Sequence, residues 1–245
     1  MRVKIKLKAV ENNLLPHGYN KYISAMLYNK IKSYDEKFFK KLHDDGYLSK
    51  LHKYKMFTFS SLKGRILKHN QDGILFEPEV HLYVSSPIIR VIEAIKNGIK
   101  LDNKVRIHNT HFECVNIERV QEPVVKKSPV IFKTISPIVA STKSDTGKKV
   151  YLTPQDSDFS RVLAKNLIRK SKLLKMSIDE EKALREVKVV PYDMMKIGAI
   201  DLYGGRITYS KGLFVYYGPA ELFNVAYRAG FGERNAQGFG MIEIL

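Results

Sequence analysis

The feature that most constrains how this chain can fold is the order in which strand-like and helix-like hydrophobic patterns follow one another. Residues 2–9, RVKIKLKA, alternate strictly between apolar and basic side chains. The apolar positions Val3, Ile5 and Leu7 would form one face, and the basic positions Arg2, Lys4, Lys6 and Lys8 the other. This two-residue alternation predicts a half-buried strand with a basic outer face.

The segments that follow alternate between helical and strand-like periods. In the first half we expect helices over residues 20–34, 35–46 and 86–98, and strands over 55–62, 79–86 and 111–120, with a hairpin over 64–78. Ser86 and Pro87 fit the start of the helix over 86–98, and Gly98 fits its end. Strand, helix, strands, helix, strand is the order of the ferredoxin-like split βαβ arrangement.

The second half can be interpreted in the same order. We expect strands over residues 130–136, 148–153, 184–190, 207–210, 212–218 and 239–245, and helices over 157–176 and 219–230. The polar segment 121–129, QEPVVKKSP, contains two prolines and fits a linker. The sequence therefore predicts an α+β chain of two tandem ferredoxin-like (RRM-like, βαββαβ) domains, residues 1–122 and 128–245, with a basic cleft between or across their sheets.

The charge of the chain indicates what such a cleft would bind. Lys and Arg number 42 against 25 Asp and Glu, a formal net charge of +17. This excess favours nucleic acid first and an anionic membrane second. We expect no membrane association, because no apolar stretch approaches the roughly 18–20 residues of a spanning helix. The single cysteine, Cys114, excludes an internal disulfide and fits a reducing, cytoplasmic environment.

Known metal and cofactor motifs are missing from the sequence. The seven histidines are scattered, and no Cys/His cluster has the spacing of metal ligands. We therefore expect no metal and no cofactor. The segment GFGERNAQGFGM, residues 230–241, follows a predicted helix and precedes a strand, whereas a dinucleotide-binding loop would follow a strand and open a helix.

This glycine-rich segment could instead hold a phosphodiester. Glycines allow an anion to approach successive backbone N–H groups, because no Cβ stands in the way. We predict RNA contacts at six of its positions: Gly230, Gly232, Arg234, Asn235, Gly238 and Gly240. A plain helix-to-strand connection explains Gly230, but it does not explain four glycines around a basic insert.

Residues 230–241 resemble the C-terminal signature of the CRISPR-associated endoribonucleases that cut repeat precursor RNA into guide RNAs, a part of the repeat-associated RNA-binding superfamily. Residues 19–33 (YNKYISAMLYNKIKS), 55–60 (KMFTFS) and 134–141 (TISPIVAS) follow the same family in the same order. The resemblance covers most of the chain, and it implies two tandem ferredoxin-like domains.

The resemblance also implies a reaction. Such enzymes cleave RNA without metal: the ribose 2′-hydroxyl attacks the adjacent phosphate and leaves a 2′,3′-cyclic phosphate and a 5′-hydroxyl. This chemistry needs a base, an acid and positive charge at the phosphorane. The resemblance places the catalytic histidine at His43, the tyrosine at Tyr28 and the lysine at Lys55. His52 is a rival or second catalytic residue, because the catalytic set varies within the family.

Two basic surfaces are further candidates for RNA binding. One is the outer face of the first strand, at Lys4 and Lys6, and the other is a stripe of Arg161, Lys165 and Arg169 on the helix over 157–176. We expect CRISPR repeat RNA as the partner, together with other interference-complex subunits, and a monomer or homodimer. The alternative is a non-catalytic guide-RNA-binding subunit of an interference complex. An RRM-type protein is disfavoured, because no aromatic-rich RNP-like strand is present.

Overall fold

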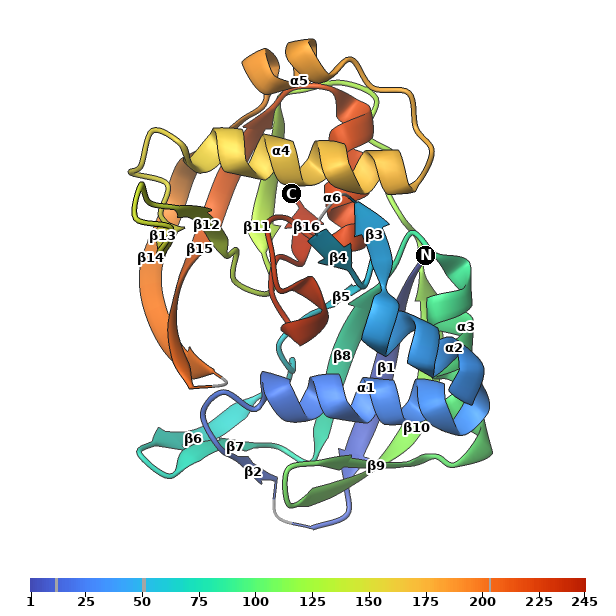
Figure 1. Cartoon of the computed structure of the whole chain (residues 1–245). Coiled ribbons are helices and arrows are strands. Elements are labelled where there is room, and N and C mark those ends of the chain that lie inside the picture. Colours follow the sequence, from blue (N-terminus) through green and yellow to red (C-terminus); the bar gives the residue numbers. More distant parts are fainter. Residues whose placement is uncertain (12, 50–51, 203) are drawn as a thin grey trace.

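The computed structural model describes residues 1–11, 13–49, 52–202 and 204–245, and these form two halves, each built on one antiparallel sheet (Figure 1). The sheet of the first half runs in the order β5 (Thr58–Phe59), β8 (Glu79–Ser85), β1 (Arg2–Ala9), β10 (Thr110–Val120) and β9 (Lys104–Ile107). As predicted for strict alternation, Val3, Ile5 and Leu7 are buried. They share one core with the helices α1 (Asn20–Tyr34) and α3 (Ile89–Leu101), which cover that face of the sheet.

Helix α3 differs from its prediction at both ends. It begins at Ile89, and it continues past Gly98 to Leu101. The expectation that Gly98 ends the helix was wrong for a non-local reason. A Cβ at Gly98 would lie 1.9 Å from the carbonyl oxygen of Lys30, so this glycine lets α3 press directly against the backbone of α1.

The sheet of the second half runs in the order β14 (Lys188–Leu202), β15 (Gly205–Tyr217), β11 (Val130–Thr134) and β16 (Ile242–Ile244). Helices α4 (Phe159–Leu173) and α6 (Ala220–Ala229) pack on it. The strands expected over 207–210 and 212–218 are one continuous strand, β15, paired with an equally long β14. Residues 180–186 form helix α5 (Glu180–Glu186), which corrects the strand expected from residue 184.

Smaller elements surround the two sheets. In the first half they are β2 (Leu14–Leu15), α2 (Glu36–Lys40), a π-helical turn (Lys41–Asp45), the hairpin β3 (Tyr47–Ser49) and β4 (His52–Tyr54), and the hairpin β6 (Ile66–Asn70) and β7 (Gly73–Phe76). In the second half they are the hairpin β12 (Ala140–Lys143) and β13 (Lys149–Leu152) and a 3-10 turn (Asn235–Gln237). Leaving aside β9, both sheets have the ferredoxin-like order, with the first strand of each half between its third and fourth. The chain therefore has two ferredoxin-like domains. Their residue limits, 1–122 and 128–245, stay a prediction.

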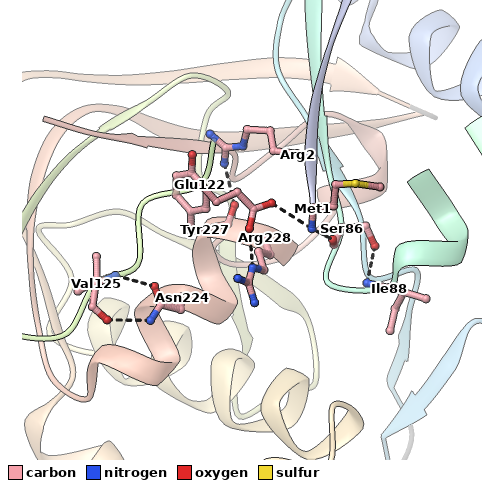
Figure 2. A network of polar contacts seen from close by, with 9 residues as sticks. All are labelled: Met1, Arg2, Ser86, Ile88, Glu122, Val125, Asn224, Tyr227 and Arg228. Carbon is pink, nitrogen blue, oxygen red and sulfur yellow. Dashed lines mark hydrogen bonds and ion pairs between the residues drawn. The ribbon is translucent and has the colours of Figure 1, made fainter. Parts of the chain in front are cut away.

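Arg2 forms one joint between the halves, although its place in the β1 pattern predicted an exposed face. It is buried, its guanidinium lies 3.8 Å from the centre of the Tyr227 ring, and it donates hydrogen bonds to the carbonyls of Tyr227 and Ile242. Figure 2 shows this cluster, in which Glu122 lies between Arg228 and the nitrogen of Met1. Burial opposes ionisation of Glu122, but hydrogen bonds from these two cations lower its pKa nonetheless.

The glycine-rich segment forms a second joint between the halves. It leaves α6, reaches the first half and returns to the second sheet (Figure 1). Three first-half side chains donate to its carbonyls: Asn20 to Gly238 at 3.1 Å, Ser24 to Ala236 at 2.7 Å and Thr58 to Phe239 at 2.9 Å. Gly238 has a positive φ of 87°, and a Cβ there would lie 2.6 Å from the ring of Phe59. This close approach requires glycine.

Candidate functional site

A cleft of about 1430 Å³ lies where α1, the β3–β4 hairpin, the β12–β13 hairpin, α4 and the glycine-rich segment meet. Tyr28, His43, Lys55 and His52 all line this cleft. The structure thus brings together all four residues that the sequence predicted as catalytic. Their catalytic role stays a prediction.

His43 is positioned by the π-helical turn, which Gly46 ends with a positive φ of 63°. The Nδ1 atom of His43 lies 2.9 Å from Oδ1 of Asp44, and this hydrogen bond lowers the pKa of the Asp44 carboxyl. The imidazole stacks on Phe39 with ring centres 5.2 Å apart. Because Nδ1 is engaged by Asp44, Nε2 is the nitrogen left for chemistry in the cleft.

Tyr28 and Lys55 lie next to this histidine. The Tyr28 ring meets the imidazole edge-to-face at a centre distance of 5.2 Å, and it packs on Phe57 at 5.5 Å. Tyr28 is half-buried on α1, in agreement with its place off the centre of the apolar stripe. The Lys55 ammonium donates to the carbonyl oxygen of His43, and burial is the main cause that lowers its pKa.

His52 has a different environment from His43. It lies on β4, and its pKa is lowered overall, mainly by burial. Two side chains of the second half also act on it: Arg169 lowers the pKa and Glu233 raises it. The next aromatic residue of that strand, Tyr54, packs against the second core and is hydrogen-bonded by Arg169. Burial raises the pKa of the Tyr54 phenol. The β3–β4 hairpin therefore carries His52 towards the second domain.

The charge of the cleft is strongly unbalanced. Among the described residues its cationic lining is Lys53, Lys55, Lys143, Lys149, Lys165, Arg169, Lys170 and Arg234. Glu233 is the one acidic residue in the same lining. A concave surface with this excess focuses positive potential and favours a polyanion.

Lys170, on α4, binds the glycine-rich segment where that segment lines the cleft. Its side chain is fully buried, and the ammonium donates to the carbonyls of Gly230 and Gly232 at 2.7 and 3.0 Å and to Oδ1 of Asn235 at 2.7 Å. Burial lowers the pKa of Lys170 to about 7. The Asn235 amide donates in turn to the carbonyls of Phe231 and Phe239 at 2.9 and 3.0 Å. The glycine-rich segment is thus held in one conformation from inside.

The RNA-binding residues predicted from sequence fall into two groups. Lys165, Arg169, Gly232, Arg234 and Asn235 line the cleft. The others do not: Lys4, Lys6, Arg161, Gly230, Gly238 and Gly240. Lys6 is paired with Glu118 at 2.5 Å, and Arg161 lies 3.6 Å from Asp158.

Three of the four glycine N–H groups are not available for the anion cradle that the sequence suggested. The amides of Gly230, Gly238 and Gly240 already donate to the carbonyls of Ala226, Asn235 and Pro137, at 2.7, 3.0 and 2.6 Å. An N–H group that donates inside the protein is not available to a phosphate. Contact of these glycines with RNA stays a prediction, without this mechanism to support it.

Sequence reasoning missed three residues of the site, Tyr54, Lys170 and Glu233, and it recognised Asp44 only as a carboxylate near His43. The order His43–Asp44 was visible as a histidine beside an acid, but its geometry depends on the π-helical turn. Lys170 lies one position from Arg169 in a basic helix and showed no sign of burial. Glu233 lies inside the glycine-rich segment, but that segment was interpreted by its glycines and its basic and amide side chains, and Glu233 was given no role.

The described ranges contain no helix long and apolar enough to cross a membrane. Within the same ranges, no three His, Cys, Asp or Glu side chains are grouped as potential metal ligands.

The fold and the cleft define the class of this protein: two ferredoxin-like domains that enclose a basic groove containing histidine, tyrosine and lysine. Residues 14–118 match the family described as "CRISPR-associated protein Cas6, N-terminal", and residues 120–244 match "CRISPR associated protein Cas6, C-terminal". The CRISPR-associated endoribonuclease Cas6 1 of Methanocaldococcus jannaschii is 32% identical over 99% of this chain and 92% of its own length. The chain therefore belongs to the Cas6 family of CRISPR-associated proteins.

Solved structures of relatives agree with the fold. One, described as "Characterization of a Cas6-related gene from Pyrococcus furiosus", is 26% identical with a TM-score of 0.85 and covers 100% of this chain and 98% of its own. Another, described as "An RAMP protein binding different RNA substrates", is 26% identical with a TM-score of 0.84 and covers 100% of this chain and 99% of its own. Both similarities extend over the two domains of this chain.

Proposed function

We propose that this protein is a guide-RNA-processing endoribonuclease that binds CRISPR repeat RNA in the cleft and cleaves it without a metal ion. The observation that carries the proposal is the contact of His43 with Tyr28 and Lys55 inside a basic cleft. The endoribonuclease name of the Methanocaldococcus jannaschii relative and the RNA-binding description of the second solved structure support it.

The proposed reaction is an internal transesterification. The 2′-hydroxyl of the ribose loses its proton and attacks the adjacent phosphorus, and the bond to the 5′-oxygen of the next nucleotide breaks as that oxygen gains a proton. The products are a 2′,3′-cyclic phosphate and a 5′-hydroxyl. One group must accept a proton and another must supply one, and each such step typically contributes a factor of about 10² to 10⁴.

His43 and Tyr28 are the proposed pair for these proton transfers. The Asp44 carboxylate holds the imidazole through Nδ1 and leaves Nε2 free for chemistry. In the proposed reaction Nε2 either takes the proton of the ribose 2′-hydroxyl or gives a proton to the leaving oxygen. Tyr28 serves the complementary oxygen. Their edge-to-face packing and the stacking of Phe39 hold the two rings in a fixed relation.

Lys55 is the proposed stabiliser of the phosphorane. Its ammonium is half-buried and hydrogen-bonded to the His43 carbonyl, so it is held near the two rings before RNA arrives. A preorganised cation in a partly desolvated site stabilises developing negative charge more strongly than a solvated one. The cationic residues of α4 and the β12–β13 hairpin would hold the flanking phosphates.

One experiment tests the reaction as a whole. The protein is incubated in excess EDTA with an RNA carrying the repeat of the CRISPR array from the same genome, with and without a 2′-deoxy substitution at the cut site. We expect cleavage in EDTA and none of the deoxy substrate. Loss of cleavage in EDTA would contradict the metal-free mechanism, and cleavage of the deoxy substrate would contradict attack by the 2′-hydroxyl. Binding without any cleavage would favour the non-catalytic RNA-binding alternative.

A pair of variants tests the assignment of the histidine. His43→Ala should reduce single-turnover cleavage by about 10² or more. His52→Ala should leave the chemical step nearly unchanged and weaken binding, because its neighbours Arg169 and Glu233 belong to the second domain. Intact cleavage by His43→Ala together with its loss in His52→Ala would show that the assignment is reversed.

A further inference from the structure

The part of the cleft that faces the second domain contains a carboxylate that a phosphate-binding surface does not explain. Glu233 is the one acidic residue among the described lining residues. A carboxylate repels phosphate, so at this place it lowers the affinity for an RNA backbone. The Glu233 carboxylate can only accept hydrogen bonds. RNA phosphates also carry only acceptors, so they cannot bind it, but nucleobases carry N–H donors that can.

Glu233 is held rigidly. Ser141 donates to its Oε1, and the Lys149 ammonium lies 2.7 Å from its Oε2. Its own backbone N–H donates to the carbonyl of Val139 at 2.9 Å. The side chain remains 31% exposed, and each carboxylate oxygen has a second lone pair for another donor. Glu233 is therefore a preorganised acceptor that still faces the cleft.

Its neighbours are those that a splayed base would need. Tyr54 and His52 present rings 6.5 Å apart, and the Arg169 guanidinium is hydrogen-bonded to Tyr54. Glu233, His52 and Tyr54 line the same cleft, and the Glu233 carboxylate acts to raise the pKa of both other groups. Sequence-specific RNA recognition commonly combines an aromatic or guanidinium plane with a hydrogen bond to the edge of an unstacked base.

We propose that Glu233 is a specificity-determining residue, which accepts a hydrogen bond from the amino or imino donor of one unpaired nucleobase stacked near Tyr54. The assignment rests on the proposed function, because it requires RNA in this cleft. It separates the cleft into a cleavage region around His43 and a base-recognition region around Glu233. The competing explanation is that Glu233 only ties the glycine-rich segment to the β12–β13 hairpin.

The test is a coupling measurement between the side chain and single base donors. Repeat RNAs blocked by a 2′-deoxy residue at the cut site are prepared with one base at a time changed: guanosine to inosine, adenosine to purine riboside, or cytidine to zebularine. Each change deletes one exocyclic amino group. A second guanosine series carries 1-methylguanosine, which deletes the imino donor. Dissociation constants are measured by fluorescence anisotropy for the wild type, Glu233→Ala and Glu233→Gln.

For the wild type we expect one position at which the loss of the donor weakens binding by about 5- to 100-fold, the range of one good base contact. In Glu233→Ala the same change should cost less than about 2-fold, because the acceptor is missing. Glu233→Gln keeps the shape but replaces one acceptor by a donor, so its preference at that position should shift towards a base with an acceptor there. Glu181→Gln is the matched control. It removes the same charge from an exposed position on α5, where the side chain is 89% exposed, and should leave every base penalty unchanged.

A purely structural tie predicts a different pattern. Glu233→Ala would then weaken all RNAs by a common factor, and the base penalties would equal those of the wild type. That result, with normal wild-type binding, would overturn this inference alone. Failure of the wild type to bind repeat RNA better than a scrambled RNA would overturn the proposed function as well.

Discussion

Gly98→Ala should destabilise the protein, although Gly98 lies inside a helix where alanine is normally preferred. From helix propensity alone, the substitution would stabilise α3 by about 1 kcal/mol. The structure predicts the opposite sign for this change in unfolding free energy. The added Cβ would lie 1.9 Å from the Lys30 carbonyl oxygen and 2.6 Å from its carbonyl carbon, and both are backbone atoms that cannot rotate away. Helices α1 and α3 would have to separate by about 1 Å or more, and such overpacking costs about 1–3 kcal/mol or above. Because the clash is with backbone, we take the upper end of that range, about 3 kcal/mol; after the gain of about 1 kcal/mol from helix propensity, we expect a net loss of about 2 kcal/mol in unfolding free energy.

Urea unfolding followed by circular dichroism measures this effect directly. The midpoint should fall while the dependence of the unfolding free energy on urea stays unchanged. The control is Glu93→Ala, on the exposed face of the same helix, which should change the unfolding free energy by less than about 0.5 kcal/mol. A Gly98→Ala variant as stable as the wild type, or more stable, would refute the close contact between the two helix backbones.

Three further predictions concern the cleft. The pKa of Lys170 is about 7 in the folded protein and about 10.4 in the unfolded chain. Between these pH values the unfolded chain binds one proton more than the folded protein, so a rise in pH favours folding. The unfolding free energy of the wild type, relative to that of Lys170→Met, should therefore rise by about 1.4 kcal/mol per pH unit. Urea melts at about pH 7.5 and about pH 9.5 measure this rise, and a constant difference would contradict it. Asp44→Asn should slow single-turnover cleavage by about 10-fold without changing RNA affinity, because it removes the negative charge beside Nδ1 of His43 and lets an amide NH2 donate to that nitrogen, which favours the other tautomer of the imidazole. A change in affinity alone would show that Asp44 does not act through the histidine. Lys165→Gln should reduce the slope of log affinity against log salt concentration by about 0.7, the value for one phosphate contact on a single strand. Arg161→Gln, one turn away and outside the cleft, should leave that slope unchanged. Equal slopes for the two variants would contradict the assignment of Lys165, but not Arg161, to the RNA-binding cleft.

The sequence predicted the elements of the fold well where local periods decide them. The alternation of residues 2–9 became β1, and the helical stripe over 20–34 became α1 with the same limits. Helix α6 begins directly after Pro219, as its position suggested. Errors occurred where one element depends on another. Gly98 does not end α3 because its missing side chain serves the contact with α1.

Arg2 shows why a correct local pattern can still give a wrong environment. Its alternation with Val3 places it on the face of β1 opposite the core, as predicted. That face is exposed at Lys8 and half-buried at Lys4 and Lys6. At Arg2 it is covered by the second domain, which supplies the Tyr227 ring and two carbonyl acceptors. Burial of this cation is offset by the hydrogen bonds of its two terminal nitrogens and by the Tyr227 ring, whereas its buried Nε has no partner among the described residues. No property of residues 2–9 indicates where the other domain lies.

The glycine-rich segment shows the same limit for the site. Four glycines around a basic insert predicted a cradle of backbone amides, but three of these amides donate to protein carbonyls, and the segment's own carbonyls accept from Ser24, Thr58 and Lys170. Two of its carbonyls therefore help to join the two domains, and residues 232–237 line the cleft. Because the first domain carries His43 and the second carries Glu233, the segment that joins the domains also fixes the spacing between the proposed cleavage region and the proposed recognition region. A rigid joint of this kind would allow one base to be recognised at a set distance from the cut.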